Sequence, residues 1–100
     1  MWKKFCKASA LEPGKSLVVE SDGRTIALFN ADGRIFAMDN TCPHRGGPLG
    51  EGSVDGTQVT CPWHAWTFDL KTGACDQDET FKQPIYKVKV ENGDVFVDTS

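Results

Sequence analysis

Short runs of alternating hydrophobic and polar residues dominate the chain. In the run near the C-terminus, Tyr86, Val88 and Val90 are expected to face a core while the residues between them face water. No window sustains a helical period, so the pattern predicts an all-β fold, a small antiparallel β-sandwich or barrel. The expected strands are Leu17 to Glu20, Thr25 to Asn30, Arg34 to Met38, Gln58 to Thr60, Ile85 to Glu91 and Asp94 to Asp98, after a first strand-like segment that includes Cys6.

Turn signals separate these runs. Four pairs combine Asp or Asn with Gly, and such pairs tolerate the positive φ angles that close tight hairpins. The pairs are Asp22-Gly23, Asp32-Gly33, Asp55-Gly56 and Asn92-Gly93.

Two segments break the strand rhythm. From Asn40 to Gly56 the chain is rich in Gly and Pro and poor in strand formers, and a long irregular stretch inside a small domain is usually functional. The second segment, Gly73 to Gln83, is polar and includes Asp76, Asp78 and Glu79, so we expect a solvated connection. The sequence shows no internal repeat and no linker at which to divide it, so residues 1–100 are expected to form one domain.

Composition narrows the function. A chain of 100 residues with 39% hydrophobic and 25% charged residues can bury a modest core but not a deep substrate pocket. A carrier or binding module is therefore expected rather than an enzyme, with no catalytic residues. The net charge of −3 and scattered lysines argue against nucleic acid. With no membrane span or secretory signal in the sequence, a cytoplasmic location and reduced cysteines are expected.

The candidate chemistry lies in two short motifs. Cys42-Pro43-His44 is followed, after sixteen residues, by Cys61-Pro62-Trp63-His64. Thiolate and imidazole are strong ligands for iron and zinc, and two such residues close together in one loop can converge on one point. The prolines stiffen their loops, and glycines 46, 47 and 50 are expected to let backbone amides approach cluster sulfurs.

This pattern resembles the signature of the Rieske family over both motifs and their flanks, Cys42 to Leu49 and Cys61 to Asp69. The resemblance implies a small all-β domain with a two-loop cluster-binding subdomain, the loops being approximately 40–50 and 60–69. It also implies one [2Fe–2S] cluster, with Cys42 and Cys61 on the inner iron and His44 and His64 on the outer iron. Two bland alternatives remain, a structural zinc site with the same four ligands and a chain with no metal at all.

The resemblance also predicts a low-potential site. High-potential members carry an extra cysteine in each loop and two hydroxyls near the sulfurs, whereas the matching positions here are Gly47, Trp63, Trp66 and Phe68. Hydrogen bonds to sulfur stabilise the charge added on reduction, so their loss lowers the potential, to about −150 mV. Trp63 is expected to shield the cluster and Phe68 to belong to the core.

Within the family, small size favours a free-standing ferredoxin. It would take single electrons from a flavoprotein reductase and pass them to a terminal oxygenase of the aromatic-ring dioxygenase type, as a monomer in transient complexes. The alternatives are a small subunit of a cytoplasmic NAD(P)H nitrite reductase and, from another class, a zinc-stapled interaction module. Arg45 is expected to be a solvated surface charge, and Cys6 and Cys75 to be ordinary thiols.

Overall fold

The computed structural model describes residues 2–41, 47–63, 65–78 and 80–99. Every strand pairing in this part of the chain is antiparallel, which confirms the all-β prediction. The elements, with two short 3-10 turns marked η, are β1 (Trp2–Lys7), η1 (Ala8–Ala10), β2 (Ser16–Ser21), β3 (Arg24–Ala31), β4 (Arg34–Asp39), η2 (Leu49–Glu51), β5 (Ser53–Asp55), β6 (Gln58–Thr60), β7 (Thr67–Asp69), β8 (Ile85–Tyr86), β9 (Val88–Glu91) and β10 (Asp94–Asp98).

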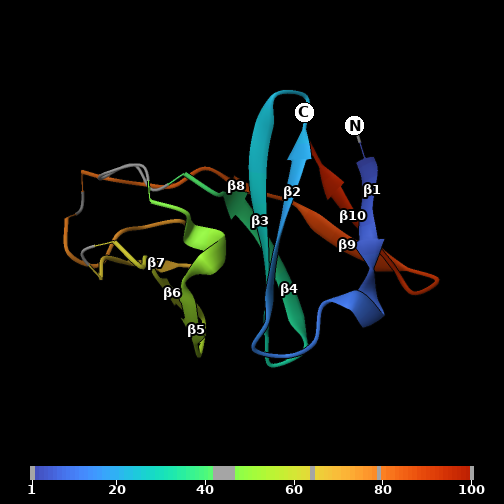
Figure 1. Cartoon of the computed structure of the whole chain (residues 1–100), viewed down its shortest axis with the longest axis horizontal. Coiled ribbons are helices and arrows are strands. Elements are labelled where there is room, and N and C mark those ends of the chain that lie inside the picture. The colour runs from blue at the N-terminus through green and yellow to red at the C-terminus, as the bar shows by residue number, and fades with distance from the viewer. Residues whose placement is uncertain (1, 42–46, 64, 79, 100) are drawn as a thin grey trace.

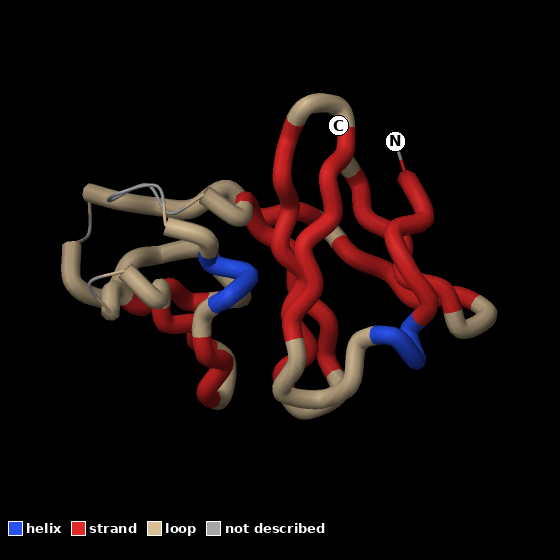
Figure 2. The backbone as a smooth tube through the Cα atoms, in the orientation of Figure 1, coloured by secondary structure: helices blue, strands red, loops and turns tan. Residues whose placement is uncertain are grey.

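The strands form three sheets arranged side by side (Figure 1). The middle sheet has the order β2-β3-β4-β8, and the sheets β1-β10-β9 and β5-β6-β7 lie on its two sides. We call the middle sheet together with β1-β10-β9 the base, and β5-β6-β7 the small sheet. Figure 2 shows how loops, rather than strands, extend beyond the small sheet on the side away from the base.

The two faces of β3 serve different cores. Ile26 and Leu28 are fully buried in the core that the middle sheet shares with β1 and β10. Ala27 and Phe29, on the opposite face, are fully buried in the core shared with β6 and β7. A strand covered on both faces is continuously apolar instead of alternating, which explains the run from Ile26 to Phe29. The base and the small sheet are therefore built on one shared strand.

The hairpin predictions are largely confirmed. Asp22, Asp32 and Asn92 have φ angles of 51°, 53° and 52°, and each is followed by a glycine that also has positive φ. These three pairs join β2 to β3, β3 to β4 and β9 to β10. The fourth turn is shifted by one residue, because Asp55 still pairs with Gln58 and the turn is therefore Gly56-Thr57.

The predicted strand from Ile85 to Glu91 is two strands in different sheets. β8 pairs with β4 and β9 pairs with β10, and the chain crosses between the sheets at Lys87, whose carbonyl accepts a hydrogen bond from Asp98 N at 2.9 Å. The predicted alternation fails beyond the crossing. Val90 lies on the edge strand of its sheet and is 50% exposed, so its assignment to the core is wrong.

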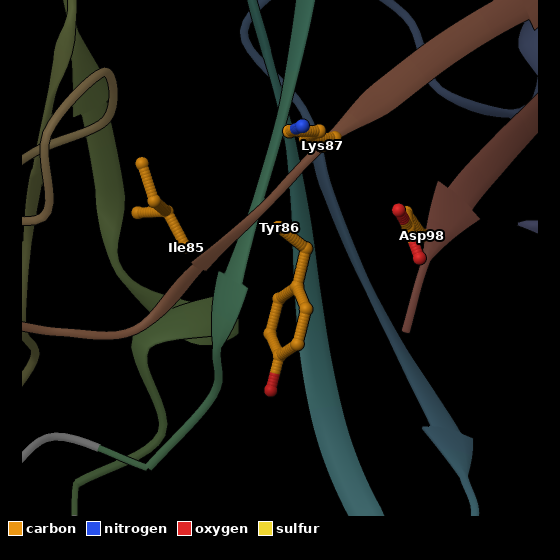
Figure 3. A pocket seen from close by; sticks show the side chains of 4 residues that line it. All are labelled: Ile85, Tyr86, Lys87 and Asp98. Carbon is orange, nitrogen blue, oxygen red and sulfur yellow. The ribbon is translucent and has the colours of Figure 1, made fainter. Parts of the chain in front are cut away.

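A pocket accompanies this crossing (Figure 3). Among the described residues, its lining consists of Ile85, Tyr86, Lys87 and Asp98. None of these side chains is a thiol or an imidazole, and the pocket belongs to the base. It therefore offers no alternative to the Cys/His motifs as a metal site.

The irregular segment from Asn40 to Gly56 contains more structure than predicted. η2 and β5 both lie within it, and β7 was not predicted either. These elements are only three residues long, so they have too few positions to show a sequence period. In the described residues, no helix is long and apolar enough to cross a bilayer.

Candidate metal centre

Backbone contacts around Asn40 join the two ends of the first motif segment. Leu49 N donates to Asn40 O at 2.7 Å, and Thr41 and Pro48 form an isolated antiparallel bridge. Asn40 N in turn donates to Thr25 O at 3.0 Å, which ties this closure to β3. Residues 42–46, which include the predicted ligands Cys42 and His44, lie outside the described residues. Both ends of their loop, however, are fixed to the middle sheet.

Gly50 does not have the role predicted for it. Its N–H donates to Asn40 Oδ1 at 2.6 Å, so this amide bonds to a side chain of the loop base instead of a cluster sulfur. A Cβ at this position would lie 2.2 Å from Val18 Cγ2. Gly50 is thus required for close packing against β2, and the prediction of an amide–sulfur contact there is wrong.

The second motif segment connects β6 to β7. Cys61 N donates to Trp66 O at 2.7 Å, directly after the Thr60–Thr67 pair of the β6–β7 ladder. Ala65 has a φ of 57°, a left-handed conformation that tightens the turn. Of the four predicted ligands, Cys61 is the one within the described residues, and it is only 1% exposed. His64 lies outside them.

The two segments meet at Gly47. A Cβ built on this residue would lie 2.8 Å from Cys61 Sγ and 2.9 Å from Trp63 Cγ. Any side chain at position 47 would therefore displace the sulfur or the indole. The glycine of the first loop is required so that its backbone can lie directly against the buried thiol of the second loop.

A third segment, Gly73 to Gln83, lies beside both loops. Gln77 Oε1 accepts from Thr67 N at 2.8 Å, and the Phe81 ring packs edge-on against Trp66 with centroids 5.4 Å apart. At the other end of the segment, Gln83 Nε2 donates to Thr41 O at 2.7 Å. The predicted solvated connection is therefore only partly solvated; its member Glu79 lies outside the described residues.

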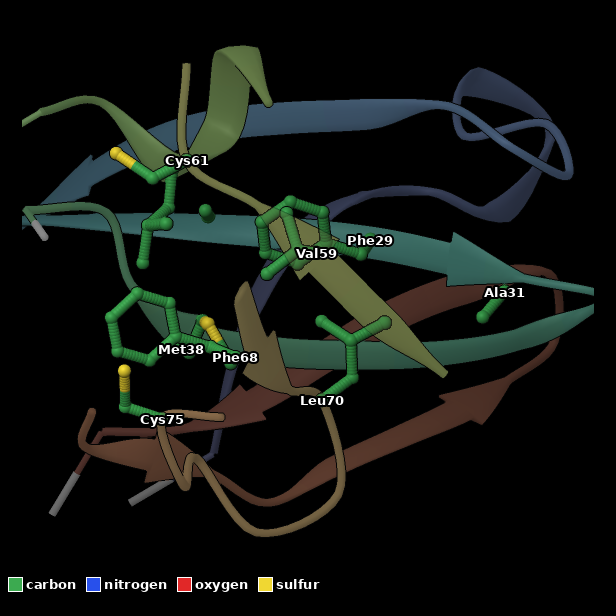
Figure 4. Close-up of a cluster of buried hydrophobic side chains, with 10 residues drawn as sticks. Phe29, Ala31, Met38, Val59, Cys61, Phe68, Leu70 and Cys75 are labelled. Atoms are coloured by element: carbon green, nitrogen blue, oxygen red, sulfur yellow. The ribbon is translucent and has the colours of Figure 1, made fainter. Parts of the chain in front are cut away.

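Cys75 is more buried than its polar surroundings in the sequence suggested. It is 4% exposed and belongs to the same core as Cys61 and Phe68 (Figure 4). Its backbone forms an isolated antiparallel bridge with Phe68. Phe68 is fully buried, which confirms its assignment to the core, whereas Trp63 is 50% exposed. Cys6 is half-buried on β1, and burial raises the pKa of its thiol.

A carboxylate–phenol pair lies where the chain enters the first loop. The carboxylate is Asp39, the last residue of β4. Its Oδ1 accepts a hydrogen bond from the Tyr86 hydroxyl at 2.7 Å. Burial raises the pKa of Tyr86, and the bond to Asp39 raises it further, because loss of the proton would place two negative charges together. Backbone bonds also hold this residue, since Asp39 N donates to Pro84 O at 3.0 Å.

A buried thiol that directly faces the backbone of a second Cys/His loop suits a metal centre that two loops share. The comparison with known families decides its type, because a sequence model of the Rieske [2Fe-2S] domain matches residues 1–93. The chain belongs to the Rieske family. The cofactor of this Rieske chain is one [2Fe–2S] cluster, so the zinc and metal-free alternatives are excluded. The close approach of the Gly47 backbone to the buried Cys61 thiol fits such a cluster.

Relatives of this Rieske chain include ferredoxin components. The ferredoxin component of the naphthalene 1,2-dioxygenase system of Pseudomonas putida is 34% identical over 100 residues, covering 99% of this chain and 96% of its own. A solved complex of reduced oxygenase and oxidised ferredoxin in carbazole 1,9a-dioxygenase contains a chain with a TM-score of 0.89 and 32% identity. The match covers 96% of this chain and 91% of that one.

A second kind of relative has the same fold. A Mycobacterium tuberculosis chain assigned as the small subunit of an NADH-dependent nitrite reductase superposes with a TM-score of 0.90 and 30% identity. Coverage is 97% of this Rieske chain and 93% of the other. Both kinds of relative share the whole domain, so the fold alone does not separate them.

Proposed function

We propose that this chain is a one-electron carrier, and not an enzyme, whose cluster is held by Cys42, His44, Cys61 and His64. The cysteines would bind the inner iron and the histidines the outer one, nearer the surface. The contact between Gly47 and Cys61 carries this proposal, because it brings the two motif segments together around a buried sulfur. Each ring would keep its second N–H free for an exposed path for electron and proton.

Single substitutions of the ligands test this assignment. Cys42→Ser and His64→Cys are each expected to abolish the Rieske electron paramagnetic resonance (EPR) signal, whose average g value lies below that of the free electron. The strand circular dichroism should largely survive, because the base has its own core. Cys6→Ser, on β1, is the matched control and should keep the signal. A wild-type spectrum in either ligand variant would contradict the assignment.

The surroundings of the cluster support a low reduction potential. Trp66 and Phe68 stand where a high-potential site would have hydroxyls; Phe68 is fully buried and Trp66 packs on Phe81. With fewer hydrogen bonds to stabilise the negative charge gained on reduction, we expect a midpoint of about −150 mV. Redox titration followed by EPR measures it, and a strongly positive midpoint would rule out this account.

The partners that we propose are a flavoprotein reductase as donor and the terminal oxygenase of an aromatic-ring dioxygenase as acceptor. Support comes from the relatives, which are components of naphthalene and carbazole dioxygenase systems, one of them solved together with its oxygenase. We place the carrier in the cytoplasm, where thiols such as Cys6 and Cys75 stay reduced. The direct test is stopped-flow transfer from the reduced carrier to purified oxygenases.

Trp63 is the side chain that we expect to contact the acceptor. It is 50% exposed although it lies against Gly47 at the meeting point of the two loops. Exposed tryptophans are enriched among the residues that dominate binding energy at protein interfaces. Trp63→Ala should slow reduction of the oxygenase about tenfold at sub-saturating oxygenase concentrations, and should affect the rate at saturation much less. Trp2→Ala, which removes a 40% exposed tryptophan from the base, is the control and should leave the rate unchanged.

A nitrite reductase subunit is the second candidate, favoured by the Mycobacterium tuberculosis neighbour. The two functions differ in the persistence of the complex. A ferredoxin should elute alone and reduce an added oxygenase, whereas a subunit should co-purify with a large reductase in a fixed ratio. Affinity purification of the chain from its native cells, followed by mass spectrometry, separates the two.

A further inference from the structure

The side-chain amide of Gln83 is buried beside the residues that lead into the first loop. It is 2% exposed, and within the described part of the chain Asn30 is the other buried polar side chain. Gln83 Nε2 donates to Thr41 O at 2.7 Å and also to Asp39 O. Thr41 is the residue immediately before Cys42. One side chain therefore bonds two carbonyls in the three residues that lead from the end of β4 into the first loop.

The position of Gln83 is itself fixed from both sides. Its own N–H donates to Gly73 O at 2.8 Å, and the carbonyl of the next residue, Pro84, accepts from Asp39 N at 3.0 Å. The amide thus comes from an anchored backbone and can impose a position on Thr41. Without it, two part-buried carbonyls would each lose a partner, and each loss costs about as much as a lost hydrogen bond.

The same segment also holds the second loop. Six residues before Gln83, the Gln77 carboxamide accepts from Thr67 N at 2.8 Å and donates to Thr67 Oγ1 at 3.0 Å, just beyond Trp66. The segment from Gly73 to Gln83 is therefore hydrogen-bonded to both loops and holds them in position relative to one another. Of its two glutamines, Gln77 is exposed and Gln83 is buried, so Gln83 has the bond that water competes with least.

We propose that Gln83 is a positioning residue that fixes the backbone of Thr41, the residue that leads directly into the proposed ligand Cys42. The inference rests on the proposed ligand set. Residues that orient the side chains bound to a metal affect both how firmly the metal is held and its electronic properties. Loss of the amide should therefore change the lifetime and the spectrum of the cluster, and not only the stability of the fold.

The test compares two buried amides. Gln83→Met keeps the length and volume of the side chain but removes both donated bonds. Asn30→Leu is the control in the base. It keeps a similar volume and removes the bond that Asn30 Nδ2 donates to Leu11 O at 2.8 Å and the bond that Oδ1 accepts from Gly33 N at 2.8 Å. Gln83→Met is expected to release iron to a chelator severalfold faster, up to about tenfold, and to broaden or shift the EPR g values. Asn30→Leu should lower the melting temperature with wild-type iron release and spectrum.

Equal behaviour of the two variants in iron release, spectrum and midpoint potential would overturn the inference and leave Gln83 a structural residue. If Gln83→Met fails to fold, Gln83→Asn takes its place, because the shorter amide cannot reach both carbonyls. A wild-type iron-release rate and spectrum in Gln83→Asn would overturn the inference as well. The proposed function fails separately, if the wild-type protein prepared anaerobically contains neither iron nor acid-labile sulfide.

Discussion

The base and the small sheet differ in strand length, although β3 of the base packs in the cores of both. In the base, β3 has eight residues and pairs along its length with β2 and β4. In the small sheet, every strand has three residues. Long ladders provide many backbone bonds and a wide packed face, whereas three-residue strands provide few of either. The base can therefore fold from its own contacts, while the small sheet depends on neighbours.

Those neighbours are the middle sheet on one side and the two loops with the Cys/His motifs on the other. Val59 and Phe68 of the small sheet are fully buried against residues of β3 and β4. The loops, by contrast, are held by a few individual contacts. Asn40 bonds close the first loop, Gly47 lies against Cys61 of the second loop, and Gln83 bonds Thr41 from the third segment. The comparison implies that the bound cluster supports the small sheet and contributes little to the stability of the base.

Removing the cluster should have the largest and most unequal effect. After chelation under reducing conditions, amide protection in β6 and β7 is expected to fall by orders of magnitude, because metal binding and local folding are coupled. Protection of β3 should stay close to its value in the loaded protein. Hydrogen exchange followed by NMR measures both. A uniform loss of protection across the chain would contradict the division into two regions.

The same leucine truncation in each region separates stability from cluster retention. Leu28, in the base core, and Leu49, in η2 beside the first loop, are both fully buried. Either change to alanine should lower the free energy of unfolding by about 3 kcal/mol. Only Leu49→Ala is expected to speed iron release, because Leu49 closes the loop that carries Cys42 and His44. Similar iron release in both variants would show that the regions are not independent.

A comparison of two glycines tests the meeting point of the loops. Gly47→Ala forces a methyl group to within 2.8 Å of Cys61 Sγ. It should lower the free energy of unfolding of the loaded protein by about 1–3 kcal/mol, mostly because the cluster is bound less firmly. Gly93→Ala, in the β9–β10 turn, has open space but a φ of 78°, so it should cost about 1 kcal/mol without changing the spectrum. Iron content and chemical denaturation measure the two quantities. The comparison fails if the spectrum of Gly47→Ala is unchanged.

The sequence was informative where the physics is local. Asp22-Gly23 and Asn92-Gly93 close hairpins because two adjacent residues must have positive φ, and that requirement shows in the residue types. The two Cys/His motifs were equally visible, since each one is complete within a few residues. Gly47 was predicted to let the backbone approach a cluster sulfur, but only the structure showed that the sulfur beside it is that of Cys61.

Contacts across long sequence distances could not be predicted. Gln83 lies 42 residues from its acceptor Thr41, and nothing in its neighbourhood distinguishes it from an exposed glutamine. The split of the predicted strand at Lys87 also had no signal, because an alternating pattern does not show which sheet a strand joins. Asn40 is intermediate: a turn-forming residue directly after a strand suggested a loop boundary, but not its bond to Gly50.

The smallest effect is expected at Tyr86, where the base meets the first loop. Burial and Asp39 raise the pKa of this phenol, so its stabilising effect is complete below the unfolded value of about 10 and is lost as the pH rises through the higher folded value. Tyr86 is the single tyrosine, so its phenolate absorbance reports it directly. The midpoint should lie above 10, and Tyr86→Phe should remove this part of the alkaline loss of stability.

The cluster spectrum should stay constant through that titration, because the Tyr86 hydroxyl bonds the side chain of Asp39 and not its backbone. The backbone of Asp39, which leads into the loop, is held separately by Gln83 and Pro84. Ionising the phenol therefore weakens the edge of the base without moving the start of the first loop. A spectral change that follows the phenolate absorbance, and is absent from Tyr86→Phe, would show that the loop takes its position from the Asp39 side chain instead.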